Sequence, residues 1–466
     1  MITFLVSIAL LIAGYCLYGL LVEKIFGADP SRKTPAIEKT DGVDFVPMKP
    51  WRIFLVQFLN IAGLGPIFGA IMGIFYGPAA FLWIVFGTIF AGGVHDYLSG
   101  MISIRKGGVS LPEIVGDELG VGIKYFMRVL SLVLLVLLTT SFLTGPANLL
   151  EGLVSLGTTG TGADTRPIYW ILIIFAYYAL ATVLPVDKLI GRFYPIFGAI
   201  LLFMGLGIMF VMLGWHSADM PEVFGPHGLA NRYDGNHPLF PMMFVSIACG
   251  AISGFHGTQS PIMSRCITNE RQGRWIFYGA MVAEGILALI WAAAAGTFFA
   301  DMTDGDGIQG LQEFATQHKG EDVKALVVDQ VSRHWLGSVG GILALIGVIA
   351  APITSGDTAL RSARLIVADF LHLDQKPIPK RLVIAVPLFL AVFGMAFVDF
   401  DIVWRYFSWT NQTLAMFTLW AATVWLYKNS KYKFGYLITA IPAIFMTAVC
   451  ITYILIAPEG FHLHLW

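Results

Sequence analysis

The sequence predicts an all-α polytopic membrane protein with about 12 transmembrane helices and an inverted five-helix repeat whose first helix is discontinuous in each half. Three observations predict it: the composition, the spacing of apolar runs, and helix-breaking sequence inside two runs. Of the 466 residues, 57% are hydrophobic and 13% are charged, against roughly 45–50% and about 25% in a soluble domain. The 50 glycines, 35 phenylalanines and 12 tryptophans suit close-packed membrane helices with aromatic interface belts. A soluble enzyme and a disordered chain are nearly excluded.

Apolar runs long enough to cross a bilayer core, which takes about 20 residues, occur twelve times. They lie near residues 2–26, 51–76, 78–103, 124–150, 168–185, 190–214, 240–266, 275–299, 335–360, 382–398, 402–427 and 434–457. The first run lacks a basic start and a cleavage site, so we expect it to stay as a helix. The predicted parts are an extra N-terminal helix and cytoplasmic loop (1–50), a first repeat (51–214), a second, inverted repeat (240–427) and a last helix with its tail (434–466).

Lysine and arginine divide unevenly between the loops of this arrangement. If the loop after the first span is cytoplasmic, that side holds 23 of these residues and the opposite side holds 6. Because basic residues concentrate on the cytoplasmic side, both termini are predicted to face outward. The long outer loop 215–239 is expected to be solvated, since its three histidines fit no zinc pattern. The outer loop 300–334 is expected to hold a short amphipathic helix.

The composition also limits the partners. The net charge of −1 offers no basic field for nucleic acid, so the expected partners are the lipid bilayer and a small-molecule substrate. The four cysteines have no metal-ligand spacing and are expected to be packing residues. No cofactor is predicted apart from a coupling ion, and the oligomeric state is left open.

Helix-breaking sequence lies in the middle of two spans. Residues 60–69 of the second span contain Gly63, Gly65 and Pro66, and residues 249–261 of the seventh contain further glycines and a Ser-Pro pair. Non-helical backbone at that depth is tolerated only where protein or a wet cavity satisfies it. Pro66 after Gly65, and Pro261 after Ser260, are start signals of a new helix. Each span is therefore predicted to be two half-helices joined by open backbone.

The two breaks lie five spans apart, and the spans that follow them correspond. The next span carries His95-Asp96 in one set and Glu284 in the other, and the third spans carry polar interruptions at 144–147 and 354–359. Because five is odd, the second set runs inverted, which is the architecture of many secondary transporters. The alternative is that the glycines only allow close helix packing.

These residues resemble the carbon starvation protein A (CstA) family, the peptide transporter carbon starvation family of the amino acid–polyamine–organocation superfamily. The matching stretches are Ile61–Pro66, Val94–Asp96, Ile247–Arg265, Phe277–Trp291, Ala350–Ala363 and Trp404–Leu414. The resemblance implies a secondary transporter that takes up peptides or pyruvate through the bacterial inner membrane.

The chain departs from that family in two respects. Many members are longer at the C-terminal end. Members related to the enterobacterial proteins have a His-His pair in place of Val56-Gln57, and they tend to have Gln-Asp in place of His95-Asp96. The substrate and coupling ion of those relatives therefore do not transfer directly.

The predicted substrate site lies at the two breaks. A carboxylate needs donors, and a half-helix N-terminus offers free N–H groups and about half a positive charge. Side chains of the second break add further donors and acceptors. The predicted substrate-binding residues are Gly63, Gly65, Pro66, Gly254, His256, Thr258, Gln259, Ser260 and Pro261. The alternative is that His256 and Gln259 simply satisfy the unwound backbone.

Buried acids are the predicted proton carriers. Glu284, Asp96 and Asp357 lie in the cytoplasmic halves of their spans, and His95 lies beside Asp96. An ionisable group at that depth costs at least about 2.5 kcal/mol and marks a function by default. Burial favours the protonated form of a carboxyl, which suits proton coupling. Glu284 ranks first, since no cationic residue lies within one helical turn of it. The alternative is structural pairing of the acids with Arg265 or Arg361.

Sodium is the other candidate coupling ion. Ala351, Thr354 and Ser355 offer a carbonyl and two hydroxyls facing the first broken helix, and related superfamily members bind sodium at this kind of site. Against it, Thr and Ser in a membrane helix often just bond the carbonyl four residues back. The polar pair Asn411 and Gln412 is predicted to lock its helix to the bundle or to line the outer path.

Taken together, the residues predict a cation-coupled symporter of short peptides or a small carboxylate. The alternative is a nutrient sensor or transceptor that binds such ligands without net transport and needs no buried acids. No G-x-S-x-G, H-E-x-x-H or comparable motif is present, so an intramembrane enzyme is not predicted. A channel is disfavoured because two broken helices indicate an occluded midplane site.

Overall fold

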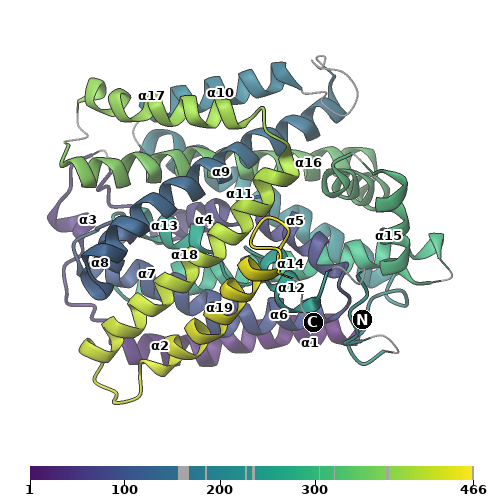
Figure 1. Ribbon diagram of the computed structural model, residues 1–466, viewed down its shortest axis with the longest axis horizontal. Helices are drawn as coiled ribbons and strands as arrows, with labels where there is room; N and C mark the ends of the chain where they lie inside the picture. The colour runs from purple at the N-terminus through teal and green to yellow at the C-terminus, as the bar shows by residue number, and fades with distance from the viewer. Residues whose placement is uncertain are drawn as a thin grey trace.

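The computed structural model describes residues 1–42, 44–155, 167–183, 186–225, 228–233, 237–303, 305–319, 321–373 and 377–463. Within these ranges the secondary structure is entirely helical, so the predicted all-α class is confirmed. Figure 1 shows a bundle of long helices, with α4, α5, α13 and α14 in its middle and α10 packed against α17 at one edge. Arg166, Lys376 and the side chains of Lys188 and Arg192, all counted in the charge asymmetry, lie outside the described residues, as does His227.

The first half of the described chain runs through α1 (Ile2–Ala13), η1 (Gly14–Tyr18), α2 (Gly19–Phe26), α3 (Pro35–Glu38), α4 (Pro50–Ile61), α5 (Gly65–Ile74), α6 (Ala79–Gly87), η2 (Thr88–Gly92), α7 (Gly93–Arg105), α8 (Leu111–Leu119), α9 (Val121–Leu153), α10 (Ile168–Val183) and α11 (Val186–Trp215). The second half runs through α12 (Leu239–Ser246), α13 (Gly254–Ser264), η4 (Arg274–Tyr278), α14 (Gly279–Phe298), η5 (Ala300–Met302), α15 (Gly307–Gln317), α16 (Val323–Leu371), α17 (Ile378–Met395), α18 (Phe400–Asn429) and α19 (Leu437–Ile456). Three elements, η1, η2 and η4, are π-helical turns that continue into α-helix.

In the described residues, 8 helices are long and apolar enough to cross a membrane, and the bent pair α4–α5 brings the number to 9. The three remaining predicted spans also form helices, but α10 is short, α12–α13 is broken and α18 carries many polar residues. The twelve crossings, the two inverted repeats and the outward termini therefore stay predictions. The short amphipathic helix expected in the loop 300–334 is present as the first turns of α16, and a further helix, α15, precedes it.

The first predicted break is confirmed. Helix α4 ends at Ile61, α5 begins at Gly65, and the two are bent by 46°. Pro66 lies in the first turn of α5, where its missing N–H removes no helical hydrogen bond. The three residues between the helices are non-helical or capping backbone, as the sequence predicted.

The second predicted break exists, but its predicted helix start is wrong. Helix α13 begins at Gly254 and runs through Ser260 and Pro261 to Ser264, so the open backbone is 247–253 instead. The reason is a cap supplied by α18: Asn411 Oδ1 accepts the Phe255 N–H at 2.7 Å and the Ser253 hydroxyl at 3.1 Å. Because this cap comes from another helix, the local sequence around Gly254 does not predict the helix start.

The polar stretches noted in the third spans do not interrupt their helices. Helix α9 is continuous through 144–147, with Pro146 inside it, and α16 is continuous through 354–359. The Thr144 hydroxyl donates a hydrogen bond to the Thr140 carbonyl at 3.0 Å, so this polar group finds its partner within the helix. A proline in a buried membrane helix costs a bond without ending the helix when neighbouring helices pack around it.

Candidate functional site

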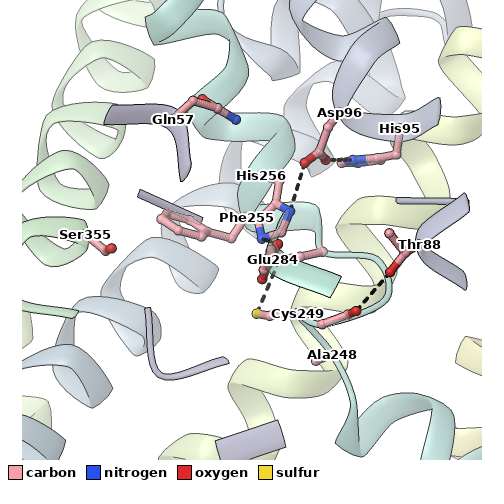
Figure 2. Close-up of polar contacts among 12 residues, drawn as sticks. Gln57, Thr88, His95, Asp96, Ala248, Cys249, Phe255, His256, Glu284 and Ser355 are labelled. Atoms are coloured by element: carbon pink, nitrogen blue, oxygen red, sulfur yellow. Dashed lines mark hydrogen bonds and ion pairs between the residues drawn. The ribbon is translucent and has the colours of Figure 1, made fainter. Parts of the chain in front are cut away.

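The main polar site is a group of four fully buried side chains, His95, Asp96, His256 and Glu284, which we call the histidine–carboxylate cluster. His95 Nδ1 lies 2.8 Å from Asp96 Oδ1, and His256 Nδ1 lies 3.0 Å from Asp96 Oδ2. On its other side, His256 Nε2 lies 3.5 Å from Glu284 Oε2. Figure 2 shows the imidazole of His256 between the two carboxylates. Three predicted coupling residues and one predicted substrate residue thus form one site.

Close backbone packing brings these side chains together. An added Cβ at Gly92, just before α7, would lie 2.3 Å from the Ala251 carbonyl oxygen. The Thr88 hydroxyl in η2 donates to the Gly250 carbonyl at 3.1 Å (Figure 2). The start of α7 therefore lies directly against the open backbone 247–253. This contact holds His95 and Asp96 beside the first turn of α13, where His256 lies.

The geometry of the cluster limits where its protons can lie. When Asp96 is ionised, it only accepts hydrogen bonds, so Nδ1 of both His95 and His256 then carries a hydrogen. The remaining ring nitrogen of His256, Nε2, then faces Glu284 with a lone pair or a second proton. His256 and Glu284 can share one proton: either the carboxyl holds it, or the imidazolium does. This is the arrangement expected of a proton-binding site.

Several buried polar atoms in and near the cluster have no hydrogen-bond partner within the described part of the chain. They are Gln57 Oε1, Asn60 Nδ2, His95 Nε2, His256 Nε2, Gln259 Oε1 and both carboxyl oxygens of Glu284. Such atoms cost about 1–3 kcal/mol each when nothing meets them. Proteins retain such unpaired buried atoms chiefly where a ligand, a proton or a water molecule can bind to them.

A second polar group, which we call the amide–hydroxyl belt, joins α4, α13 and α16. Gln259 Nε2 donates to Ser362 Oγ at 3.0 Å and to Thr258 Oγ1 at 3.1 Å. Gln57 Nε2 lies 3.4 Å from Ser260 Oγ. The belt begins one helical turn from His256 along α13, so α13 carries side chains of both groups.

The belt continues beside the first break. Thr358 donates its hydroxyl to Asn60 Oδ1 at 3.2 Å. Gly63 lies against the ring of Phe142 on α9, where an added Cβ would be 2.7 Å from the ring. Phe142 packs edge-on against Phe255, with ring centroids 6.2 Å apart. Phe142 therefore links α9 both to the first break and to the first turn of α13.

The predicted sodium ligands lie where the sequence placed them but are hydrogen-bonded to one another. Thr354 and Ser355 both donate to the Ala351 carbonyl at 2.8 Å, and Ser355 also lies 2.9 Å from the Leu59 carbonyl oxygen of α4. The set therefore faces the first broken helix, as predicted, and its hydroxyls make the back-bonds that the alternative expected. Sodium coupling stays a prediction.

Asp357 is buried on α16, but no described contact brings it into the cluster. The expected alternative of pairing with Arg265 or Arg361 is wrong for Asp96 and Glu284, which contact histidines. Arg265 Nε donates to the Gly108 carbonyl at 2.8 Å, and Arg361 lies 3.8 Å from Asp44.

Asn411 and Gln412 lock α18 to the second break, as one of the two predictions had it. Besides capping α13, Asn411 donates from Nδ2 toward the Ala248 carbonyl at 3.4 Å. Gln412 Nε2 donates to the Phe244 carbonyl at 3.1 Å. Side-chain amides of α18 therefore hold the open backbone 247–253.

Two cavities lie on opposite sides of the cluster. One, of about 780 Å³, is lined by Trp404, Ser408 and Ser246 at the end of α12, on the side predicted to be outer. The other, of about 640 Å³, is lined by Asp44, Arg265 and the loop after α7. Neither of these two cavities is lined by a cluster residue.

The sequence reasoning missed the amides of the first half-helix and the hydroxyl of Ser362. Gln57 and Asn60 lie three residues apart in an apolar run, and Thr358 and Ser362 lie four apart, so each pair shares a helix face. That spacing, in spans facing the breaks, could have identified them.

Comparison with known proteins identifies the family of this chain and several relatives. The family description "Carbon starvation protein CstA" matches residues 1–163 and 158–318. An uncharacterized membrane protein of Haemophilus influenzae is 44% identical over 339 residues, 64% of this chain and 91% of that protein. The peptide transporter CstA of Campylobacter jejuni is 27% identical over 94% of this chain and 78% of its own length. The pyruvate/proton symporter BtsT of Escherichia coli is 28% identical over 65% of this chain and 50% of its own length.

Solved structures show the same fold at low sequence identity. A crystal structure of the Eremococcus coleocola manganese transporter, in complex with an aromatic bis-isothiourea substituted compound, has a TM-score of 0.58 at 13% identity, covering 89% of this chain and 90% of that one. MhsT in complex with L-phenylalanine has a TM-score of 0.57 at 15% identity, covering 87% and 98%. The chain therefore belongs to the carbon starvation protein CstA family, and it is a multi-pass membrane transporter rather than an enzyme.

Proposed function

We propose that this transporter is a proton-coupled symporter that carries a small carboxylate, such as pyruvate, or a short peptide into a bacterial cell. The observation that carries the proposal is His256 between two buried carboxylates, 3.0 Å from Asp96 and 3.5 Å from Glu284. The names of two relatives, a pyruvate/proton symporter and a peptide transporter, support the substrate class.

The proton site in this proposal is the pair His256 and Glu284. With Asp96 ionised and both histidines neutral, adding one proton to the pair reduces its buried negative charge. That protonation offsets the cost of bringing a second negative charge, the substrate carboxylate, into the same low-dielectric region. Proton and anion then favour each other's binding, which is the thermodynamic basis of symport.

The substrate seat in this proposal is the amide–hydroxyl belt beside the first break. The N-terminus of α5 at Gly65 supplies backbone donors and positive potential. Gln57, Asn60 and Gln259 supply amide groups that have an unmatched buried atom each. Because His256 and Gln259 lie one turn apart on α13, a shift of this short helix moves both sites together.

The test is uptake of labelled pyruvate and labelled dipeptides into proteoliposomes, with pH and sodium gradients imposed separately. For Glu284→Gln we expect pH-driven accumulation to fall to passive equilibration, because the amide cannot share a proton with His256. Exchange of substrate down its own gradient should persist, since the belt is intact. Asp357→Asn is the matched control, another buried acid that should keep proton-driven accumulation.

A different result would reverse the assignment of the coupling ion. If a sodium gradient alone drives uptake and Glu284→Gln stays coupled, the proton proposal is wrong. A raised sodium requirement in Thr354→Ala and Ser355→Ala would then identify the oxygen set around Ala351 as the coupling site.

A further inference from the structure

Three π-helical turns meet at one buried tyrosine, Tyr278, which is the last residue of η4. Its ring lies against the glycines that follow the other two turns. An added Cβ would lie 2.7 Å from this ring at Gly93, after η2, and 3.4 Å from it at Gly19, after η1. Tyr15 and Tyr18 of η1 are its titratable neighbours. Since π-turns are rare and occur frequently at functional sites, this meeting point deserves a physical account.

The hydroxyl of Tyr278 completes the hydrogen bonds of η2. At the end of this turn, the Gly93 N–H bonds to the carbonyl of Thr88, five residues back. In a regular α-helix the same N–H would bond to the carbonyl of Ile89, four residues back. The Ile89 carbonyl therefore needs another donor, and the Tyr278 hydroxyl donates to it at 2.7 Å. This bond stabilises the π form of η2 over the α form.

The turn η2 lies beside the chain segments that form the histidine–carboxylate cluster. Asp96 lies in the first turn of α7, which follows η2 directly. The Thr88 hydroxyl donates to the Gly250 carbonyl of the second break at 3.1 Å. On the side of α14, an added Cβ at Gly285, the residue after Glu284, would lie 2.7 Å from the Thr88 hydroxyl oxygen. A change in the shape of η2 therefore reaches the whole cluster.

The form of η2 sets the direction in which Asp96 points. If η2 became α-helix without losing a residue, α7 would rotate by about 100° relative to α6, since an α-helix has about 3.6 residues per turn. Asp96 Oδ2, which lies 3.0 Å from His256 Nδ1, would then turn away. Among the described residues, no hydrogen bond joins Tyr278 to the cluster, so Tyr278 acts through the backbone of η2.

Asp96 carries the charge that acts on the proposed proton pair, His256 and Glu284. The segments packed around this pair contribute two further titratable groups: His95, which bonds to Asp96, and the thiol of Cys249 in the open backbone. A negative charge beside the pair favours a proton on it. Movement of Asp96 away from His256 therefore weakens proton binding by the pair.

We propose that Tyr278 is a positioning residue of the proton site: its hydroxyl holds η2 in the π form and thereby keeps Asp96 against His256. Asp96 makes the contact, and Tyr278 acts only through the backbone between them. The role of the cluster in coupled transport rests on the proposed function; the effect of Tyr278 on proton binding by the cluster does not.

The test is an infrared pH titration of the purified protein, which requires no transport. Bands that Glu284→Gln or His256→Gln removes report the proton of the pair. Tyr278→Phe keeps the ring and removes only the hydroxyl. We expect it to move the midpoint of these bands to lower pH by about one unit, a tenfold weaker proton binding. Tyr178→Phe is the matched control, because it also removes a buried hydroxyl that donates to a backbone carbonyl, at 3.1 Å, and it should keep the wild-type midpoint.

A deletion supplies the compensating variant. Without Ala91, the bond from the Gly93 N–H to the Thr88 carbonyl becomes an ordinary α-helical bond, so α7 keeps its orientation, and the Ile89 carbonyl finds its donor within the helix. Deletion of Ala91 in the Tyr278→Phe background should therefore restore the wild-type midpoint. This double variant also carries the test if Tyr278→Phe alone does not fold.

The possible outcomes separate this inference from the proposed function. An unchanged midpoint in Tyr278→Phe, an equal shift in Tyr178→Phe, or a folded double variant whose midpoint stays shifted would overturn the positioning role. A wild type without any titrating band from the pair would overturn the proton site and its positioning together. Absence of proton-driven uptake by the wild type, with the effect of Tyr278→Phe on the titration intact, would overturn the proposed function and leave the positioning role standing.

Discussion

At the scale of single residues, Gln259 separates binding from folding most clearly. Its Nε2 donates to Thr258 and Ser362, while its Oε1 is buried without a partner in the described residues. The side chain thus gains two hydrogen bonds, each worth about 0.5–1.5 kcal/mol net, and carries an unmatched acceptor that costs a similar amount. Little net stability depends on it, which fits the proposed role of Gln259 in the substrate seat.

We expect Gln259→Ala to lose most uptake while its unfolding free energy changes by about 1 kcal/mol or less. Uptake in proteoliposomes and thermal melting in detergent measure the two effects. The control is Asn411→Ala, which removes the amide that caps α13 at Phe255 and should lower Tm instead. A Gln259→Ala protein that transports normally, or that is lost through instability alone, would remove Gln259 from the substrate seat.

The sequence identified His95, Asp96, His256 and Glu284 individually, because buried charge in an apolar span is conspicuous. It did not predict that they form one group. That proximity depends on the close approach of α7 to the open backbone at Ala251. A glycine at position 92 permits this approach, but a glycine alone does not predict it. Tertiary packing between distant segments brings the four side chains together.

At the scale of elements, the start of α13 shows the same limit. The Ser-Pro pair at 260–261 is a genuine start signal, but the helix begins earlier because Asn411 caps it at Phe255. The first break follows its local signal at Gly65 and Pro66, with no such cap from a neighbouring helix among the described contacts of Leu64 to Pro66. Local sequence therefore predicted one half-helix correctly and the other one two turns too late.

We expect Asn411→Ala to destabilise the protein by about 1–3 kcal/mol, because it leaves the buried Phe255 N–H without an acceptor. Cys249, buried in the open backbone beside this cap, should then react faster with a thiol reagent. Asn429→Ala on the same helix, which loses a partly buried bond to the Trp425 carbonyl, serves as the control. Unchanged melting and unchanged Cys249 reactivity would show that α13 does not need the cap.

The close contact between Gly254 and α18 leads to a second prediction at the scale of elements. A Cβ at Gly254 would lie 2.3 Å from the Asn411 carbonyl oxygen and 2.7 Å from the Ala415 backbone nitrogen. Backbone atoms cannot move aside easily, so Gly254→Ala should cost about 1–3 kcal/mol or more. Gly152→Ala in α9, where nothing lies within 4 Å, should be neutral or slightly stabilising. Comparison of the two melting temperatures checks this, and equal values would contradict the packing.

At the scale of the whole molecule, the helices fit the predicted orientation without determining it. The prediction places Lys319, which follows α15, on the outer side. It places Arg271, just before η4, on the cytoplasmic side. The helix between them, η4 with α14, spans residues 274–298, which at about 1.5 Å per residue is long enough to cross the bilayer. The two positions should therefore lie on opposite sides.

We expect a cysteine at Arg271 to be labelled by an impermeant reagent only from the cytoplasm, and one at Lys319 only from outside. Both residues are exposed, and a Cys16→Ser background removes the exposed native thiol. Intact cells and inside-out vesicles supply the two faces. Labelling of both positions from the same face would contradict the twelve-crossing arrangement and the inverted repeat with it.

The contact between the two breaks restricts how this family can change over time. A side chain at Gly65 would overlap that of Cys249, since its Cβ would lie 2.3 Å from the Cys249 Cβ and Sγ atoms. Positions almost two hundred residues apart in the chain thus share one small space. A relative that acquires alanine at the first position should carry glycine at the second, so the pair should covary across an alignment. The record of substitutions in related genomes would then report the contact independently of any structure.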